Sequence, residues 1–208
     1  MTIDHIFIFV NSKEEAEALV DFGLSEGSGN AHKGIGTANR RFFFDNFYLE
    51  ILWVEHESEA KSVEEIGIWK RYKHKESGYS RFGVCFTNTK EADTIFEKAI
   101  QWKPMFLQND EHVDILTTKN LPWIFRFPPN RQKNLKDEPR KHKAGLKQLN
   151  KVEMSIDTID FSDELNAIKS NTIVEFKKAE RNALVLEFDN AKSGKIQTFK
   201  NLDLVIRY

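Results

Sequence analysis

The chain has 208 residues, 40% of them hydrophobic and 30% charged, which is the ordinary range of a globular protein with a sizeable core. Its formal net charge is -1, so no overall field attracts nucleic acid or a membrane surface. The single cysteine, Cys85, excludes an internal disulfide framework and fits a reducing compartment, and its apolar neighbours indicate a buried thiol. No segment reads as a signal peptide or a membrane span, so we expect a cytoplasmic protein.

A strand followed by a helix is predicted at the start of the chain. Residues 3–10 are almost entirely apolar, as in a strand that is buried on both faces, and His5 lies on one of those faces. Asn11 and Ser12 favour a helix N-terminus, and Gly23 favours its end.

Three strand-like segments follow at residues 24–31, 38–44 and 47–54. Asp45 and Asn46 separate the last two segments and predict a hairpin turn. The final strand carries Glu50 in the middle of an apolar run, where a carboxylate is costly to bury unless it is paired or bound to a ligand.

The same order of elements returns later in the chain. A connecting helix is predicted over 62–75, and a second copy follows over 79–127, with a helix over 88–102. The second copy contains FTNTKEADTIF, which matches FVNSKEEAEAL of the first almost position for position. The repetition predicts an internal duplication of one module, which spans residues 1–54 in its first copy.

The remaining chain divides into a linker and a shorter third segment. Residues 128–145 are basic and contain proline, and they predict a solvated linker, because a nucleic-acid surface would interleave aromatic side chains. Residues 146–208 read as the same strand and helix order in a shorter βαβββ-like copy, with Glu187 in the place of Glu50.

These features resemble the vicinal oxygen chelate superfamily, and within it the glyoxalase-like proteins of the glyoxalase, bleomycin-resistance and dioxygenase type. The resemblance rests on Asp4 and His5 in the first strand, the run HKGIGTAN at 32–39 and the closing-strand sequence YLE at 48–50. It covers at least the first ~127 residues. It implies an α+β fold in which repeated βαβββ modules form a curled mixed sheet, shaped as a cup, with the helices on the outside.

The resemblance also implies a divalent metal in the cup, such as Zn, Fe, Mn, Ni or Mg. In that family a His or Glu from each module's first strand and a Glu from its last strand hold the ion. His5 and Glu50 take those positions in the first module, and Glu50 is the candidate catalytic carboxylate. The ion would act as a Lewis acid that polarises a carbonyl or stabilises an enolate.

The second module departs from this pattern. Alignment of the repeats puts Phe82 opposite His5 and Arg126 near Glu50, and neither side chain can ligate a metal. A further ligand would have to come from His32, His112 or Asp114. Arg126 could instead bind a carboxylate or phosphate of a ligand, or pair with Glu50 in a cup without metal.

Two functions therefore stay open. The first is a metal-dependent lyase, isomerase or dioxygenase that acts on a small oxygen-rich molecule. The second is a non-catalytic protein of the bleomycin-resistance type, which binds a small aromatic or anionic molecule without metal; a dimerising domain without a ligand is a third reading. The expected ligand contacts are Arg126, Asn39, His32 and Tyr48. Modules of this family often pair between chains, and a third module leaves an unpaired sheet edge, so we expect a homodimer.

Overall fold

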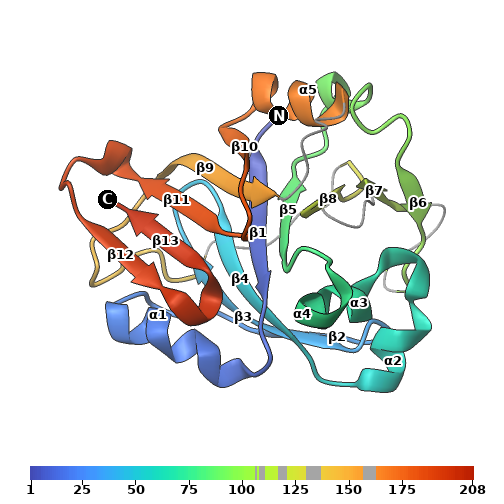
Figure 1. Cartoon of the computed structure of the whole chain (residues 1–208), viewed down its shortest axis with the longest axis horizontal. Coiled ribbons are helices and arrows are strands. Elements are labelled where there is room, and N and C mark those ends of the chain that lie inside the picture. Colours follow the sequence, from blue (N-terminus) through green and yellow to red (C-terminus); the bar gives the residue numbers. More distant parts are fainter. Residues whose placement is uncertain (106, 108–110, 117–120, 130–136, 157–162) are drawn as a thin grey trace.

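The computed structural model describes residues 1–105, 107, 111–116, 121–129, 137–156 and 163–208. Its strands form an eight-stranded sheet and a five-stranded sheet, both mixed and both open at their edges, with short helices around them (Figure 1). The predicted α+β class is confirmed. Among the helices of the described residues, none has the length and apolar character that a membrane crossing needs.

The first module has the predicted order of strand, helix and three strands. Its elements are β1 (Ile3–Phe9), the 3-10 helix η1 (Lys13–Ala16), α1 (Glu17–Phe22), β2 (Asn30–His32), β3 (Thr37–Phe43) and β4 (Tyr48–Val54). β1 lies parallel to β4, and β3 is antiparallel to both β2 and β4. The predicted helix end is confirmed, because Gly23 has a φ of 105°, a left-handed conformation that glycine adopts without steric cost.

The second module repeats this topology with shorter elements. They are β5 (Phe82–Phe86), η3 (Lys90–Ala92), β6 (Ile100–Trp102), β7 (Val113–Leu116) and β8 (Trp123–Arg126). The helix predicted over 88–102 is wrong beyond its first turn, since η3 is followed by irregular turns. The last three residues of that range form β6 and pair with β7, so sheet pairing overrides the helical spacing there.

The connection between the modules is also broken up. In place of one helix over 62–75 it contains α2 (Glu57–Ser62), η2 (Glu64–Ile66), α3 (Ile68–Tyr72) and α4 (His74–Ser77). Gly67 has a φ of 68°, which ends η2 and cannot continue an α-helix. The resulting bend buries Ile66 and Ile68 in the apolar cluster on the concave side of the large sheet.

The two modules meet edge to edge. β1 and β5 are antiparallel neighbours, and the strand order of the large sheet is β2-β3-β4-β1-β5-β8-β7-β6. Each module thus supplies four consecutive strands, and their first strands lie at the centre of the sheet (Figure 1). This is the paired arrangement that the internal repeat predicts.

The third segment differs from the other two. It contains β9 (Leu149–Ile156), α5 (Asp163–Asn171), β10 (Val174–Lys178), β11 (Leu184–Phe188), η4 (Asp189–Ala191), β12 (Ile196–Phe199), η5 (Lys200–Leu202) and β13 (Leu204–Arg207). The order in its sheet is β10-β9-β11-β13-β12, with β10 parallel to β9. The chain order predicted for this segment, a strand, a helix and three strands, is present as β9, α5, β10, β11 and β12, but the order of the strands in the sheet differs from that of the other two modules. β13 adds a fifth strand, and it pairs with β11, so β9 lies beside β11 and not beside the last strand.

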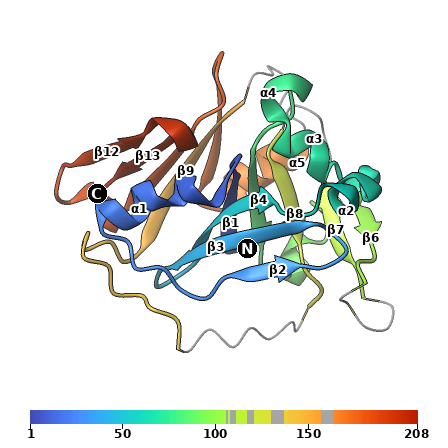
Figure 2. The same ribbon diagram turned by 90° about the horizontal axis from the view of Figure 1, so that it is seen from below.

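The five-stranded sheet packs on the outer, convex side of the first module. One apolar cluster contains Ile6 and Leu49 of the large sheet together with Val152 and Leu186 of the small one. α1 lies between the two sheets at this side (Figure 2), and its Phe22 makes edge contacts with aromatic rings of the third segment. The concave side of the large sheet is left for the cavity described below.

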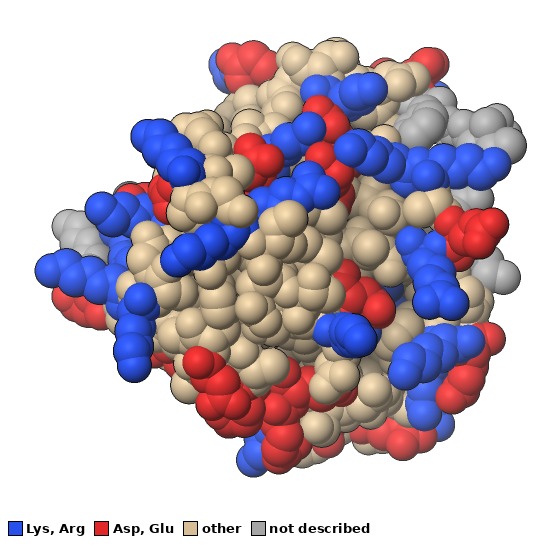
Figure 3. Space-filling model, turned by 60° about the vertical axis from the view of Figure 1, so that its left-hand side comes forward, with Lys and Arg blue, Asp and Glu red and all other residues tan. Residues whose placement is uncertain are grey.

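The molecular surface carries charges of both signs. On the side shown in Figure 3, Lys and Arg are interspersed with Asp and Glu around an uncharged area. On the five-stranded sheet, ion pairs link neighbouring strands, for example Lys177 with Glu153 and Lys151 with Glu175. A partly exposed pair such as Lys151 with Glu175 contributes little stability by itself, whereas Glu153 is itself buried.

Candidate functional site: a cavity on the concave side of the sheet

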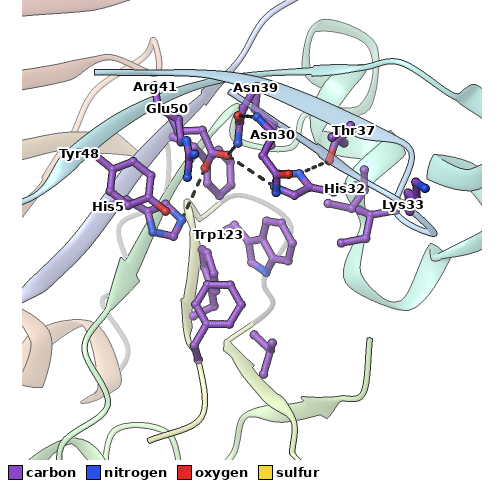
Figure 4. A pocket seen from close by; sticks show the side chains of 18 of the residues that line it. His5, Asn30, His32, Lys33, Thr37, Asn39, Arg41, Tyr48, Glu50 and Trp123 are labelled. Atoms are coloured by element: carbon purple, nitrogen blue, oxygen red, sulfur yellow. Dashed lines mark hydrogen bonds and ion pairs between the residues drawn. The ribbon is translucent and has the colours of Figure 1, made fainter. Parts of the chain in front are cut away.

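The large sheet curls around a cavity of about 600 Å³. Strand alternation decides which side chains enter it. His5 on β1, Asn39 on β3 and Glu50 on β4 point inward from the first module, and Trp123 on β8 points inward from the second (Figure 4). The first module thus supplies a polar side of the cavity, and the second module supplies an aromatic side.

His5 is held between two carboxylates. Its Nδ1 lies 2.5 Å from Oδ1 of Asp4, which places the ring proton on Nδ1, because a carboxylate can only accept. The pairing of β1 with β5 shifts register between Ile3 and His5, and this irregularity spans the position of Asp4. The other ring nitrogen, Nε2, faces Oε2 of Glu50 at 3.6 Å, which is too long for a hydrogen bond.

Glu50 is buried, with 5% of its surface exposed, and its carboxylate is oriented by neighbours on β2 and β3. Its Oε1 accepts a hydrogen bond from Nδ2 of Asn39, and the Oδ1 of Asn39 accepts the backbone N–H of Asn30 at 2.7 Å. His32 presents Nε2 at 4.0 Å from the same Oε1, while its Nδ1 lies 2.9 Å from Oγ1 of Thr37. The predicted contacts Asn39 and His32 therefore both lie beside Glu50.

Tyr48 forms the wall next to His5. Its ring stacks on the imidazole with centroids 4.7 Å apart. Burial raises the pKa of the Tyr48 hydroxyl well above its ordinary value, and the negative charges of Glu50 and Asp4 add to the effect. Tyr48 therefore stays protonated and neutral at physiological pH.

The side chains at this end of the cavity are of the types that bind divalent metals. Two imidazole Nε2 atoms, from His5 and His32, face the two oxygens of one buried carboxylate, which is a donor combination found in zinc and non-haem iron sites. Their Nδ1 atoms are held by Asp4 and Thr37. Histidine ligands of metals are oriented by outer partners in this way, and so are carboxylate ligands.

A second donor group shares His5. Ligand atoms of Asp4, His5 and Cys85 all lie within 4.8 Å of one another. Cys85 has no exposed surface, and the carboxylate of Asp4 is already bonded to Nδ1 of His5. An ion there would lack an open position toward the cavity. His5, His32 and Glu50 do line the cavity, although their ligand atoms do not all lie within 4.8 Å of one another.

From the second module, the buried Cys85 lies near His5, but the positions that alignment places opposite His5 and Glu50 supply no ligand in the described residues. Phe82, which alignment places opposite His5, lies in the apolar cluster on the other face of the sheet. The neighbouring residue Gly83 faces the concave side, where a Cβ would lie 2.1 Å from the ring of Phe7. On β8, Trp123 and Phe125 occupy the cavity face, and their rings stack on each other at 5.1 Å.

The expectation that Arg126 faces the cup is wrong. Arg126 is on the opposite face of β8, where Nε donates to Asp114 and Nη1 donates to Asp93, each at 2.8 Å. His112 also pairs with Asp114, at 3.1 Å, so neither of them closes a metal shell in the cavity. A shift of one residue along a strand moves a side chain to the other face of the sheet, and the alignment of the two repeats does not fix the register to within one residue.

An inward-facing cation close to Glu50 is Arg41 on β3, which is not among the ligand contacts expected from the sequence. The alternation of Thr37, Asn39 and Arg41 on one face of β3 is the sequence signal that identifies it. The same alternation in WIFRF marks Trp123 and Phe125 as inward and Arg126 as outward.

Comparison with known proteins agrees with this architecture. A model of the glyoxalase-like domain family matches residues 3–162. No curated protein sequence matches the chain. A solved structure of a hypothetical protein from Staphylococcus aureus shares 13% identity and covers 99% of this chain and 98% of its own, with a TM-score of 0.63.

Two further solved structures have lower TM-scores, and one of them covers a smaller part of this chain. Methylmalonyl-CoA epimerase in complex with methylmalonyl-CoA and NH4+ shares 15% identity, over 62% of this chain and 95% of its own, with a TM-score of 0.42. A mutant of 4-hydroxymandelate synthase from Streptomyces coelicolor shares 8% identity, over 99% of this chain and 61% of its own, with a TM-score of 0.49. Since the family model spans more than half of the chain, the protein belongs to the glyoxalase-like domain family.

Proposed function

We propose that the cavity is the active site of a metal-dependent enzyme that acts on a small oxygen-rich molecule, as a lyase, isomerase or dioxygenase. The observation that supports it is the convergence of His5 and His32 on Glu50 at 3.6 and 4.0 Å. Neither contact is a hydrogen bond, which would need a distance of about 2.7–3.2 Å. To share one ion, the three side chains would have to move closer together, because their ligand atoms do not all lie within 4.8 Å of one another as those of Asp4, His5 and Cys85 do.

Each residue around the carboxylate has a separable role in this proposal. When bound, the metal supplies a Lewis acid that polarises a substrate oxygen. Asp4 keeps the proton of His5 on Nδ1, so that the lone pair of Nε2 points toward the site. Asn39 fixes one oxygen of Glu50 by a hydrogen bond. In a reaction that moves a proton, Glu50 is our candidate base, because it is the carboxylate at the polar end of the cavity.

The aromatic side of the cavity has a different task. Phe7, Trp123 and Phe125 contact one another with ring centroids 5.1 to 6.2 Å apart, so they form a continuous apolar wall. Such a wall excludes water from the polar end and packs against the apolar part of a substrate.

Titration of the chelator-treated protein with Zn²⁺ or Co²⁺ tests the metal. We expect one ion per chain by calorimetry, and a loss of affinity of more than about tenfold in each of His5→Ala, His32→Ala and Glu50→Gln, because each removes one ligand. Asn39→Ala keeps all three ligands but leaves Glu50 less well oriented, so its affinity should fall by a smaller factor.

His112→Ala is the matched control, since His112 lies outside the cavity and pairs with Asp114. Its metal affinity should equal that of the wild type. Equal affinity in the His32 and Glu50 variants would contradict the proposed site.

A metal-free binding protein is the second candidate function. It is favoured by the aromatic residues Trp123 and Phe125, which stand where a paired module would supply a metal ligand. A thermal-shift screen of small aromatic compounds in the presence of EDTA distinguishes the two functions. Stabilisation that is independent of metal, in a protein that does not bind Zn²⁺, supports this second candidate.

A further inference from the structure

Arg41 places a positive charge in the cavity, and no ion pair joins it to an acidic side chain of the described residues. It lies on β3 next to Arg40, whose side chain points to the other face and pairs with Glu17 and Glu26. Arg41 is the cross-strand neighbour of Glu50, yet its guanidinium makes no ion pair with any carboxylate in the described parts of the chain. A partly buried charge without a counterion is unfavourable, and a ligand of opposite charge would remove that cost.

The guanidinium is already held in position. Nε donates to the backbone oxygen of Ser28 and Nη2 donates to its Oγ, both at 2.6 Å. The charged carbon lies 5.2 Å from the ring centroid of Phe43 and 5.7 Å from that of Tyr48. Because one edge and one face are fixed, little side-chain entropy remains to be lost when the other edge binds a partner.

The remaining edge of the guanidinium is open. Nη1 has no hydrogen-bond acceptor among the described residues, and it is not closed off from solvent. Glu138 lines the same cavity, but it reaches Arg41 only through Ser28, whose Oγ and backbone N–H both donate to the Glu138 carboxylate. Glu138 therefore orients Ser28, which holds Arg41 in place, but it does not neutralise the charge of Arg41.

We infer that Arg41 binds an anionic oxygen group, a carboxylate or a phosphate, on the molecule that occupies the cavity. Arginine recognises both groups through charge-assisted hydrogen bonds. Arg41 and Tyr48 lie close to Glu50 and His5 in Figure 4, whereas Lys33, the other cation of the lining, lies at the far end. The ligand class is thus a compact anion whose apolar or aromatic body packs against Trp123 and Phe125. This inference rests on the proposed function only in that the same cavity holds the substrate.

Binding of four probes to the chelator-treated full-length protein tests the inference. They are phenylacetate, phenyl phosphate, the neutral analogue phenylacetamide, and inorganic phosphate. We expect at least one of the two aromatic anions to bind about tenfold or more tightly than phenylacetamide, as one charge-assisted contact predicts. The two aromatic anions distinguish a carboxylate from a phosphate, and inorganic phosphate shows whether the anionic group suffices without the aromatic body.

Arg41→Gln should abolish the preference for the anions, and Arg41→Lys should weaken it, because Lys keeps the charge but not the planar donor pair. Arg40→Gln removes a neighbouring charge from the opposite face and should leave the preference unchanged. Circular dichroism checks that each variant is folded. Arg41→Lys keeps the inference testable if the glutamine variant does not fold.

Two results overturn the inference: no preference for either anion in the wild type, or a preference that both Arg41 variants retain in full. The test is independent of the proposed metal, since it is carried out under chelation. Zn²⁺ titration of Arg41→Lys should give the wild-type affinity. A failure of metal binding with an intact anion preference would therefore refute the metal site and leave the role of Arg41 standing.

Discussion

A single glycine marks where the second module differs from the first. Gly83 on β5 lies opposite Phe7 on β1, and the Phe7 ring occupies the space that a side chain at Gly83 would need. The position from which a second module would send a ligand into the cavity is thus filled by an aromatic ring of the first. The metal site proposed here uses His32, on β2 of the first module, in place of a ligand from the position of Gly83.

Gly83→Ala should destabilise the protein by about 1–3 kcal/mol, the usual cost of forcing an extra methyl group into a packed interior. Urea unfolding followed by circular dichroism measures the change. In the double variant with Phe7→Leu, the smaller side chain makes room for the added Cβ, so the combined loss should be less than the sum of the two single losses. A strictly additive result would show that the ring and the Cβ do not compete for space.

At the scale of elements, two hydrogen bonds of His142 join the segment after the second module to the first module. We call this pair of hydrogen bonds the clamp. Its Nδ1 accepts the backbone N–H of Ser25, and its Nε2 donates to the backbone oxygen of Phe43, both at 2.9 Å. This pairing requires the neutral ring, because a protonated ring has no acceptor nitrogen. The linker residues near 142 therefore cover the end of β3 and are not simply solvated, as the charge of this segment suggested.

The clamp predicts a loss of stability in mild acid. Burial lowers the pKa of His142 below its ordinary value of 6.5, although the bond to Phe43 and the charge of Asp45 act in the opposite direction. As the pH falls, His142 is therefore protonated at a higher pH in the unfolded chain than in the folded chain. The contribution of His142 is complete above about pH 6.5 and is lost as the pH falls through the lower folded pKa.

Urea unfolding at pH 7.5 and pH 5 tests this clamp. His142→Gln, which can keep one acceptor and one donor, should lose less unfolding free energy between the two pH values than the wild type does. Burial also lowers the pKa of His74, so part of the dependence should remain in the variant. His56→Gln, at an exposed site, is the control and should behave as the wild type. An unchanged dependence in His142→Gln would contradict the role of the clamp.

At the scale of the whole molecule, the two sheets share one apolar core. Ile6 of the first module, Val84 of the second and Val152 of the third segment belong to the same buried cluster. The third segment thus supports the convex side of the sheet whose concave side carries the cavity. Contact between the two sheets buries apolar surface on each of them, and that surface would be exposed to water if either sheet stood by itself.

The shared core predicts that the chain unfolds in one cooperative transition. Far-ultraviolet circular dichroism, which follows both sheets, and tryptophan fluorescence should give the same urea midpoint. The four tryptophans all lie before residue 146, so fluorescence reports only on the large sheet and its helices. Separate midpoints for the two signals would show that the third segment folds as an independent unit.

Local sequence patterns determined much of this protein. The alternation along β1 and β4 places His5 and Glu50 on the same side of one sheet, and the repeated motif predicts the paired modules. Both follow from the two-residue period of a strand, which is local information. The family named from these residues is confirmed by the family model.

Only the tertiary structure decided which side chains surround Glu50. His32 and Arg41 approach it because β2, β3 and β4 pair and curl together, whereas Arg126 faces away because β8 presents its odd-numbered residues to the cavity. A one-residue shift in aligning the two modules reverses every inward and outward assignment, and local periodicity does not fix that shift. The packing of Phe7 against Gly83 and of the third segment against the convex face is decided by contacts between residues far apart in the chain.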